Sequence, residues 1–115
     1  MDTDSNDLGA QPLDAMMNAW QMSNHEMVEV STEQLTHKQV QRARMGRRLT
    51  LKMMQKVTRA YNVSLWYKFS DEQKERYFEY MHKHLFNYAK GFDAAFVDPN
   101  EALRKEVMES KEEES

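Results

Sequence analysis

The chain has 115 residues, a formal net charge of −3 and a hydrophobic content of 40%. A chain of this size supports one small core and excludes a multidomain protein. It contains no cysteine, which excludes a disulfide framework, a thiolate metal site and a cysteine nucleophile. Three glycines, two prolines and few β-branched residues favour an all-α fold over a β-sheet.

Both ends of the chain are polar and acidic. Residues 1–12 include a glycine and a proline, and residues 109–115 hold four glutamates, one lysine and two serines, so we expect both segments to be disordered. The first residues are acidic where a secretory signal is basic, and no apolar stretch is long enough to cross a bilayer. We therefore expect a cytoplasmic protein without membrane contacts.

Helix signals begin directly after the first tail. Apolar side chains recur at helical spacing over about 14–21, which predicts a first amphipathic helix. Ser23 and Glu26 then have the pattern of a capping box, in which two side chains satisfy free backbone N–H groups at a helix start. This pattern predicts a short second helix at about 24–30.

A second capping-box pattern, Thr36 with Gln39, marks the start of a third helix. Gly46 can take the left-handed conformation that commonly follows a helix end. Together these signals predict a third helix at about 37–45.

The next two helices are marked by hydroxyl caps. Thr50 predicts the cap of a fourth helix at about 51–61, with Asn62 as the residue that follows its end. Ser70 begins a third capping-box pattern, and helical spacing then continues, which predicts a long fifth helix to Gly91. Asp98 and a following proline predict a terminal helix. We expect an all-α fold of five to six helices with a long, aromatic-rich fifth helix.

The charge of the chain is strongly polarised. Between Gln34 and Ser70 there are nine basic residues and no acidic one, so the rest of the chain carries −12. A cationic surface attracts nucleic acid and releases condensed counterions on binding. The block therefore favours a polyanionic partner. Its basic residues are Lys38, Arg42, Arg44, Arg47, Arg48, Lys52, Lys56, Arg59 and Lys68.

The basic block also contains the pattern of a known DNA-binding family. Within the stretch 35–50, Val40, Ala43 and Gly46 have the spacing of two buried residues and a glycine, and basic residues follow. This stretch is similar to the recognition-helix region of the Cro-like phage repressors, also called the Xre type. The stretch 56–64 resembles the next helix of that family.

The resemblance covers about residues 13–64 and implies a helix-turn-helix domain there. We expect residues 65–108 to form a helical extension that packs on this domain. In this motif the first helix braces the second, which lies in the major groove of double-stranded DNA. The resemblance therefore implies a sequence-preferring transcriptional regulator with a recognition helix at about 37–45. The connection 30–35 departs from the family because it is longer than the usual turn and has no glycine.

The resemblance implies two sets of DNA contacts. The base-reading positions are His37, Lys38 and Gln41, since Gln can pair with adenine and Lys can donate to guanine. Phosphate contacts would come from the N-cap Thr36 and from basic side chains, which neutralise the backbone without reading sequence. These basic residues are Arg42, Arg44, Arg47, Arg48, Lys52, Lys56 and Arg59.

The predicted fifth helix has more aromatic residues than one helix face can bury. One stripe is most simply core and comprises Phe78, Met81, Leu85 and Tyr88, together with Trp66. We expect the remaining rings to be exposed and to form a contact surface, most simply that of a homodimer. These rings are Tyr77, Tyr80 and Phe86.

The sequence offers no support for catalysis or for a cofactor. It has no Gly-rich phosphate loop, and His82 and His84 stand two positions apart, which places them on different faces of a helix. We expect no enzyme activity, no metal, no cofactor and no small-molecule ligand. Two other functions stay open. One is a protein-interaction adaptor that uses the basic face and the aromatic C-terminal helix, and the other is an RNA or single-strand binder.

Overall fold

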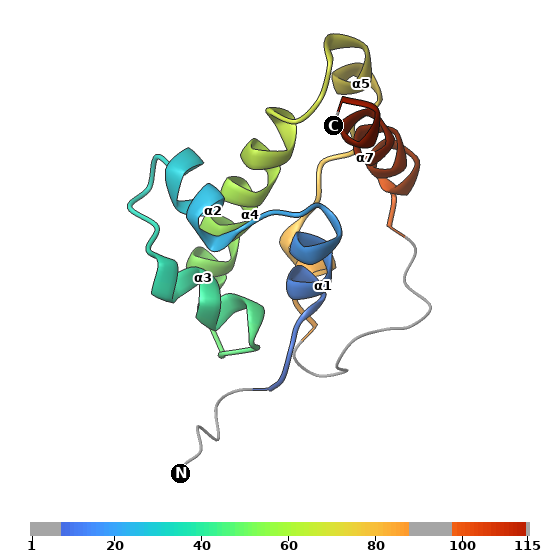
Figure 1. The fold of residues 1–115 in the computed structure, drawn as a ribbon. Coiled ribbons are helices and arrows are strands. Elements are labelled where there is room, and N and C mark those ends of the chain that lie inside the picture. The colour runs from blue at the N-terminus through green and yellow to red at the C-terminus, as the bar shows by residue number, and fades with distance from the viewer. Residues whose placement is uncertain (1–7, 88–97, 115) are drawn as a thin grey trace.

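The computed structural model describes residues 8–87 and 98–114, with side chains up to Ser110 in the last helix. Every regular element in this part of the chain is a helix, which confirms the all-α prediction. None of these helices is both long and apolar enough to cross a membrane. In chain order they are α1 (Pro12–Ala19), α2 (Asn24–Val30), α3 (His37–Arg44), α4 (Leu51–Trp66), α5 (Asp71–Arg76), α6 (His82–Leu85) and α7 (Glu101–Glu114) (Figure 1).

The first four helices surround one core. α2 packs against both α3 and α4, and α1 packs against α3 (Figure 1). The side chains between them are apolar and almost fully buried, as expected for the inward stripes of amphipathic helices. They include Leu13, Met17, Trp20, Met27, Val40, Ala43, Val57, Tyr61 and Leu65. The predicted helices at 14–21, 24–30 and 37–45 are therefore confirmed to within two residues.

Both ends of α3 have the predicted caps. The Thr36 hydroxyl accepts a hydrogen bond from the Gln39 N–H at 3.1 Å, and the Gln39 side chain accepts one from the Thr36 N–H at 3.1 Å. Gly46 has a φ of 86°. The N–H of Arg47 bonds to the carbonyl of Arg42 at 3.0 Å, which closes a Schellman motif. The orientation of α3 is thus set by local chemistry at its two ends.

The beginning of the chain packs against the end of α3. The N–H of Leu8 donates to the carbonyl of Gly46, and the N–H of Gln11 donates to the carbonyl of Arg44, both at 2.9 Å. Gln11 and Pro12 are buried. The prediction of disorder over 1–12 is therefore wrong for residues 8–12, because Gly46 lacks a side chain and lets the chain approach closely. Residues 1–7 lie outside the described part.

Helix α4 is longer than predicted. It does not end at Asn62 but continues to Trp66, so the expected domain boundary after residue 64 falls inside a helix. Asn62 is buried, and its Nδ2 donates to the carbonyl of Thr58 at 3.0 Å within the helix. A buried asparagine with other partners does not act as a helix end, and local sequence does not reveal those partners.

The long fifth helix is the main error of the sequence-based prediction. The chain forms α5, runs extended from Tyr77 to Met81, and forms the short helix α6. Asn62 binds both peptide groups of Tyr80, accepting from its N–H at 2.8 Å and donating to its carbonyl at 2.7 Å. Asn100 binds both the N–H and the carbonyl of Phe78 in the same way. These four bonds replace the helical ones, and the predicted continuation over 88–91 lies outside the described residues.

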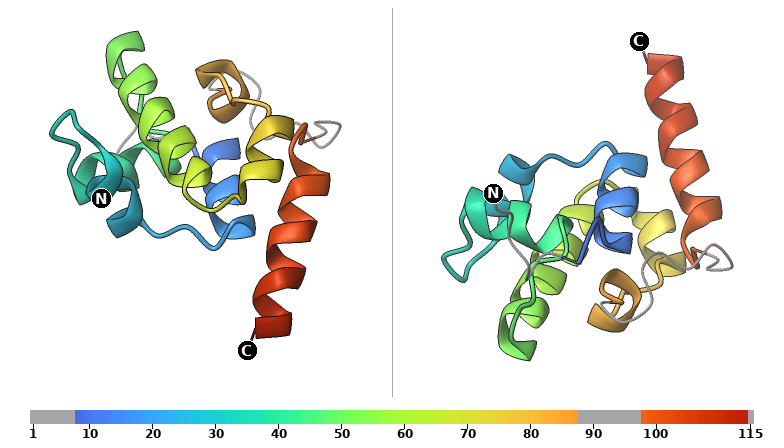
Figure 2. Two further views of the ribbon diagram at one scale, coloured as in Figure 1. Left: turned by 90° about the horizontal axis from the view of Figure 1, so that it is seen from above. Right: turned by 90° about the horizontal axis from the view of Figure 1, so that it is seen from below.

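The last helix lies on the opposite side of the molecule from α3 (Figures 1 and 2). α7 buries Leu103 and Val107, and Arg76 of α5 forms two bonds of 2.7 and 2.8 Å to Glu106. The helix continues to Glu114, so the prediction of a disordered segment over 109–115 is wrong for residues 109–114. Six of the fourteen residues of α7 are glutamates, which places this acidic element far from the predicted recognition helix.

Candidate nucleic-acid interface

The connection between α2 and α3 is closed by side chains rather than by a glycine. Gln34 takes a left-handed conformation with a φ of 59°. Its carbonyl accepts a hydrogen bond from Lys56 Nζ at 3.2 Å, and the Ser31 hydroxyl accepts one from the N–H of Glu33 at 3.1 Å. The six-residue connection therefore holds α3 against α2 and α4 without the short turn of the resembled family.

The solvent face of α3 carries the predicted contact residues. Val40 and Ala43 are completely buried, and the residues on the other side of the helix are exposed. This exposed side comprises His37, Lys38, Gln41 and Arg42. The structure therefore brings the three predicted base-reading residues onto one accessible helix surface together with one predicted phosphate contact.

The nine basic residues of the block have different surroundings. Arg44 is turned inward with 15% of its side chain exposed, and it bonds Asp14 at 2.6 Å, so the expected phosphate contact does not fit it. Lys68, near the other end of the block, pairs with Glu26 at 2.9 Å. Burial by itself raises the pKa of Glu26, but the hydrogen bond and charge of Lys68, together with hydrogen bonds from the Ser64 side chain and the Ser23 backbone, hold that pKa below its ordinary value.

Two further cations of the block are engaged by the α2–α3 connection. Arg59 forms a bidentate pair with Glu33, with distances of 2.7 and 2.5 Å. The hydrogen bond from Arg59, which outweighs partial burial, lowers the pKa of Glu33. Lys56 donates to the Gln34 carbonyl, as described above. Both were expected to contact phosphates, but here they stabilise the connection that positions α3.

Four exposed cations remain. Within the described residues, none of their four side chains forms a hydrogen bond or an ion pair, in contrast to the paired cations named above. Two lie on α3, one in the loop after it and one in the first turn of α4. We call them the α3 basic face, and they are Lys38, Arg42, Arg48 and Lys52. Arg47, in the same loop, is half-buried and has contacts of its own.

The starts of α2 and α3 meet through two histidines. His25 Nδ1 lies 3.3 Å from His37 Nε2, and the two rings stack at an interplanar angle of 13°. His25 Nε2 also lies 3.3 Å from Glu29. The His37 ring is therefore held by a neighbour on α2. Within the described part of the chain, no group of three or more His, Cys, Asp or Glu residues is arranged to hold a metal ion.

A polar network also joins α1, α2 and α3. The three guanidinium nitrogens of Arg44 donate separately to Asp14 Oδ1 at 2.6 Å, Asn24 Oδ1 at 2.7 Å and Asn18 Oδ1 at 2.7 Å. Asn24 Nδ2 in turn donates to Gln41 Oε1 at 3.0 Å. The roles of Asp14, Asn18 and Asn24 in this network were not predicted from the sequence. The only signal was the i, i+4 spacing of Asp14 and Asn18 on one face of α1.

The three rings predicted to form an interface are not exposed. Tyr80 and Phe86 are 1% and 7% exposed, and Tyr77 is half-buried against the core. Tyr77 and Tyr80 donate from their hydroxyls to Asn62 and Asp98, respectively. In an extended segment the side chains alternate, so the inward and outward sets differ from those of a helix. Homodimer formation stays a prediction, but these three rings do not supply the exposed surface that was expected for it.

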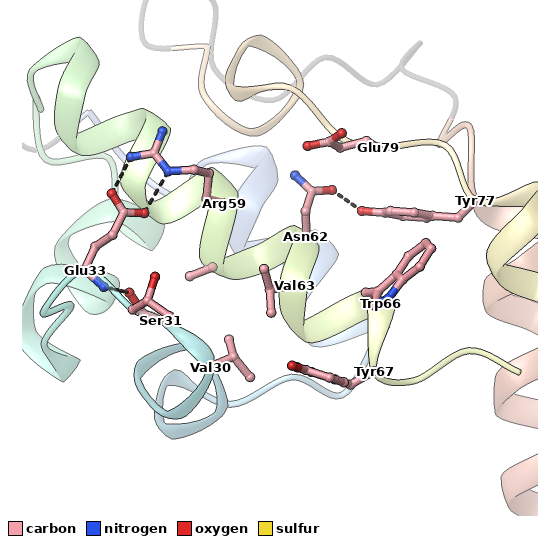
Figure 3. Close-up of a pocket in the computed structure, with 12 residues that line it drawn as sticks. Val30, Ser31, Glu33, Arg59, Asn62, Val63, Trp66, Tyr67, Tyr77 and Glu79 are labelled. Atoms are coloured by element: carbon pink, nitrogen blue, oxygen red, sulfur yellow. Dashed lines mark hydrogen bonds and ion pairs between the residues drawn. The ribbon is translucent and has the colours of Figure 1, made fainter. Parts of the chain in front are cut away.

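The large exposed apolar side chains lie elsewhere. Phe78, Met81 and Trp66, which were expected to be core, are each more than 40% exposed, while Leu85 is buried as expected and Tyr88 lies outside the described residues. Trp66 and Tyr67 line a surface groove of 760 Å³ between the α2–α3 connection, α4 and residues 77–79 (Figure 3). Lys74 Nζ lies 5.2 Å from the Trp66 ring centre in a cation–π contact. The groove is separate from the exposed side of α3.

Comparison with protein-family models, curated proteins and solved structures found no match for this chain.

Proposed function

We propose that this protein binds double-stranded DNA with a sequence preference, that α3 enters the major groove, and that the protein regulates transcription. The observation that carries the proposal is the α3 basic face. Its four cations are exposed and unpaired within the described residues, whereas Arg44, Arg59 and Lys68 of the same block pair with carboxylates. Two of them lie on the exposed side of α3, a capped helix that would be the second arm of the proposed helix-turn-helix, and the other two lie in the loop after α3 and in the first turn of α4.

The arrangement separates two kinds of contact. Lys38 and Gln41 project from the exposed side of α3, where a helix in the major groove presents side chains to base edges. Arg48 and Lys52 lie after the helix, where they are placed to neutralise phosphates. The acidic α7 lies on the opposite side of the molecule, which reduces its repulsion of a polyanion bound at α3 (Figure 1). The resemblance to phage repressors supports the regulatory role.

The test is a binding titration of the full chain against random duplex DNA across a salt series. If each cation of the α3 basic face contacts one phosphate, log K falls with log salt with a slope of about −4. Arg42→Ala is expected to reduce the steepness of that slope by about 1 on every duplex. Lys83→Ala is the matched control, because Lys83 is an exposed cation on α6 outside the α3 basic face.

Single-stranded DNA and RNA of the same sequences form the other arms of the titration. If the protein binds these strands as tightly as duplex DNA, or more tightly, the result would favour an RNA or single-strand binder over a protein that binds in the major groove. No binding to any nucleic acid at about 50 mM salt, where non-specific affinity is strong, would reject the proposal and favour the protein-interaction adaptor.

A further inference from the structure

A directional hydrogen-bond chain ends on the proposed recognition surface. It begins at Arg44, whose guanidinium has only donors. Its side chain is mostly buried between α1, α2 and α3, and Asp14 at 2.6 Å supplies the opposite charge. The guanidinium is therefore a fixed donor, and every group facing it must be an acceptor.

Arg44 determines the orientation of the Asn24 amide. Its NH1 lies 2.7 Å from Asn24 Oδ1, and the reverse orientation of that amide would oppose an NH2 group to a cationic N–H. The Nδ2 of Asn24 must therefore point the other way, where it donates to Gln41 Oε1 at 3.0 Å. The position of each amide oxygen follows from the donor-only chemistry of arginine, not from an arbitrary choice between O and N.

We infer that the chain Arg44, Asn24, Gln41 fixes the Gln41 side chain with its NH2 group outward, so that Gln41 acts as a hydrogen-bond donor toward DNA. Gln41 is exposed on α3, and its carbonyl is turned toward Asn24. Asn24 is a positioning residue in this arrangement, because it acts on DNA only through Gln41. The inference rests on the proposed DNA-binding function and specifies the base chemistry of its site.

The base preference follows from the atoms that each base presents. A glutamine that binds adenine bidentately needs its carbonyl toward N6 and its NH2 toward N7. A carbonyl held by Asn24 disfavours that pairing, whereas an outward NH2 matches the two acceptors of guanine, O6 and N7. We therefore expect guanine, rather than adenine, at the base that Gln41 contacts.

Asn24→Asp reverses the direction of the hydrogen bond between residue 24 and Gln41, while the side chain of residue 24 keeps its shape. One carboxylate oxygen still accepts from Arg44, and the other can only accept, so Gln41 must turn its NH2 toward residue 24 and its carbonyl outward. The matched control is Asn18→Asp, which adds the same charge to another acceptor of Arg44 but does not contact Gln41. Both variants are first compared with the parent by circular dichroism to establish that they fold.

The measurement is selection of preferred sites from a random duplex library by the parent and both variants. The parent and Asn18→Asp are expected to select guanine at one shared position. Asn24→Asp is expected to shift that position by at least about fivefold toward cytosine or adenine, whose amino groups donate. Selection of the same base by Asn24→Asp and the parent would overturn the inference while leaving the proposed function intact. A parent that binds no duplex would reject both.

A second measurement needs no DNA. Relative to the parent, the Gln41→Ala variant is expected to show a shifted side-chain amide resonance of Asn24 in a nitrogen–proton correlation spectrum, because the substitution removes the acceptor that lies 3.0 Å from Asn24 Nδ2. Gln55→Ala, an exposed glutamine on α4, is expected to leave that resonance in place. An unchanged Asn24 amide in Gln41→Ala would show that the bond is absent and would overturn the inference.

Discussion

Two parts of the molecule are held in place by different interactions: helices α1 to α4, the first part, and the extended segment 77–81, the second part. Helices α1 to α4 share a core of many apolar side chains, in which each contact contributes a little. The segment 77–81 also buries Tyr80 in this core, but its peptide groups are held by hydrogen bonds with the amides of Asn62 and Asn100. Directional bonds from two side chains fix an extended segment where apolar packing alone would permit a helix. The second part should therefore depend far more on single polar residues than the first.

The largest effect is expected from Asn62→Ala. The substitution leaves the N–H and the carbonyl of Tyr80 buried without their partners. Because each unsatisfied buried group costs about 1–3 kcal/mol, we expect the free energy of unfolding to fall by about 3 kcal/mol. Urea denaturation measures this change, and hydrogen exchange shows whether residues 77–81 open first.

Gln55→Ala is the control, because Gln55 is exposed on the same helix. It is expected to change stability by no more than about 0.5 kcal/mol. Equal effects of the two substitutions, or unchanged protection of the Tyr80 amide in Asn62→Ala, would show that apolar contacts rather than Asn62 hold the segment.

The same difference between the two parts explains what was predictable. The caps at Ser23, Thr36 and Thr50 and the turn at Gly46 depend on residues within five positions of one another, and all four occur where expected. The break after α5 depends on Asn62, eighteen positions before Tyr80 in the chain. The local sequence of the aromatic segment after α5 therefore predicts a helix, since no residue within that segment competes with helical hydrogen bonds.

The candidate site divides in the same way. The exposure of Lys38, Gln41 and Arg42 follows from helical spacing relative to the buried side of α3, and it was predicted. The inward turn of Arg44 was not, because its partner Asp14 is thirty positions away. A count of charges along the sequence cannot distinguish a free cation from a cation that pairs with a carboxylate on another helix.

Gly46→Ala is expected to have the next largest effect, and it tests the first part of the molecule. A Cβ at this position would lie 2.1 Å from the Gly9 carbonyl, and the φ of 86° is unfavourable for alanine. We expect a loss of about 2–3 kcal/mol, from left-handed strain and from displacement of residues 8–12. Thermal or urea unfolding measures the loss.

Gly9→Ala separates the two causes. Gly9 also has a positive φ, of 96°, but a Cβ there meets nothing within 4 Å. This variant is therefore expected to show only the strain, about 1–2 kcal/mol. If Gly46→Ala costs no more than Gly9→Ala, the docking of residues 8–12 contributes nothing to the stability of the first part.

The smallest effect is expected from Glu26→Gln, which removes the negative charge that joins α2 to residues 64–68 at the end of the first part. Glu26 bonds Lys68 at 2.9 Å and Ser64 at 3.0 Å, and its side chain is 37% exposed. A pair this exposed is worth about 0.5–1 kcal/mol at neutral pH after solvent screening. The pKa of Glu26 is lower in the folded chain than its ordinary value of 4.5. The contribution of ionised Glu26 to the free energy of unfolding is therefore complete above pH 4.5, and it is lost as the pH falls through the lower pKa of the folded chain.

Urea unfolding between neutral pH and pH 3 measures this contribution. The free energy of unfolding is expected to fall less on acidification for Glu26→Gln than for the parent, and Glu29→Gln serves as the exposed control on α2. Parallel pH curves for Glu26→Gln and the parent would mean that Lys68 contributes no net stabilisation, and that apolar packing alone holds α2 on α4.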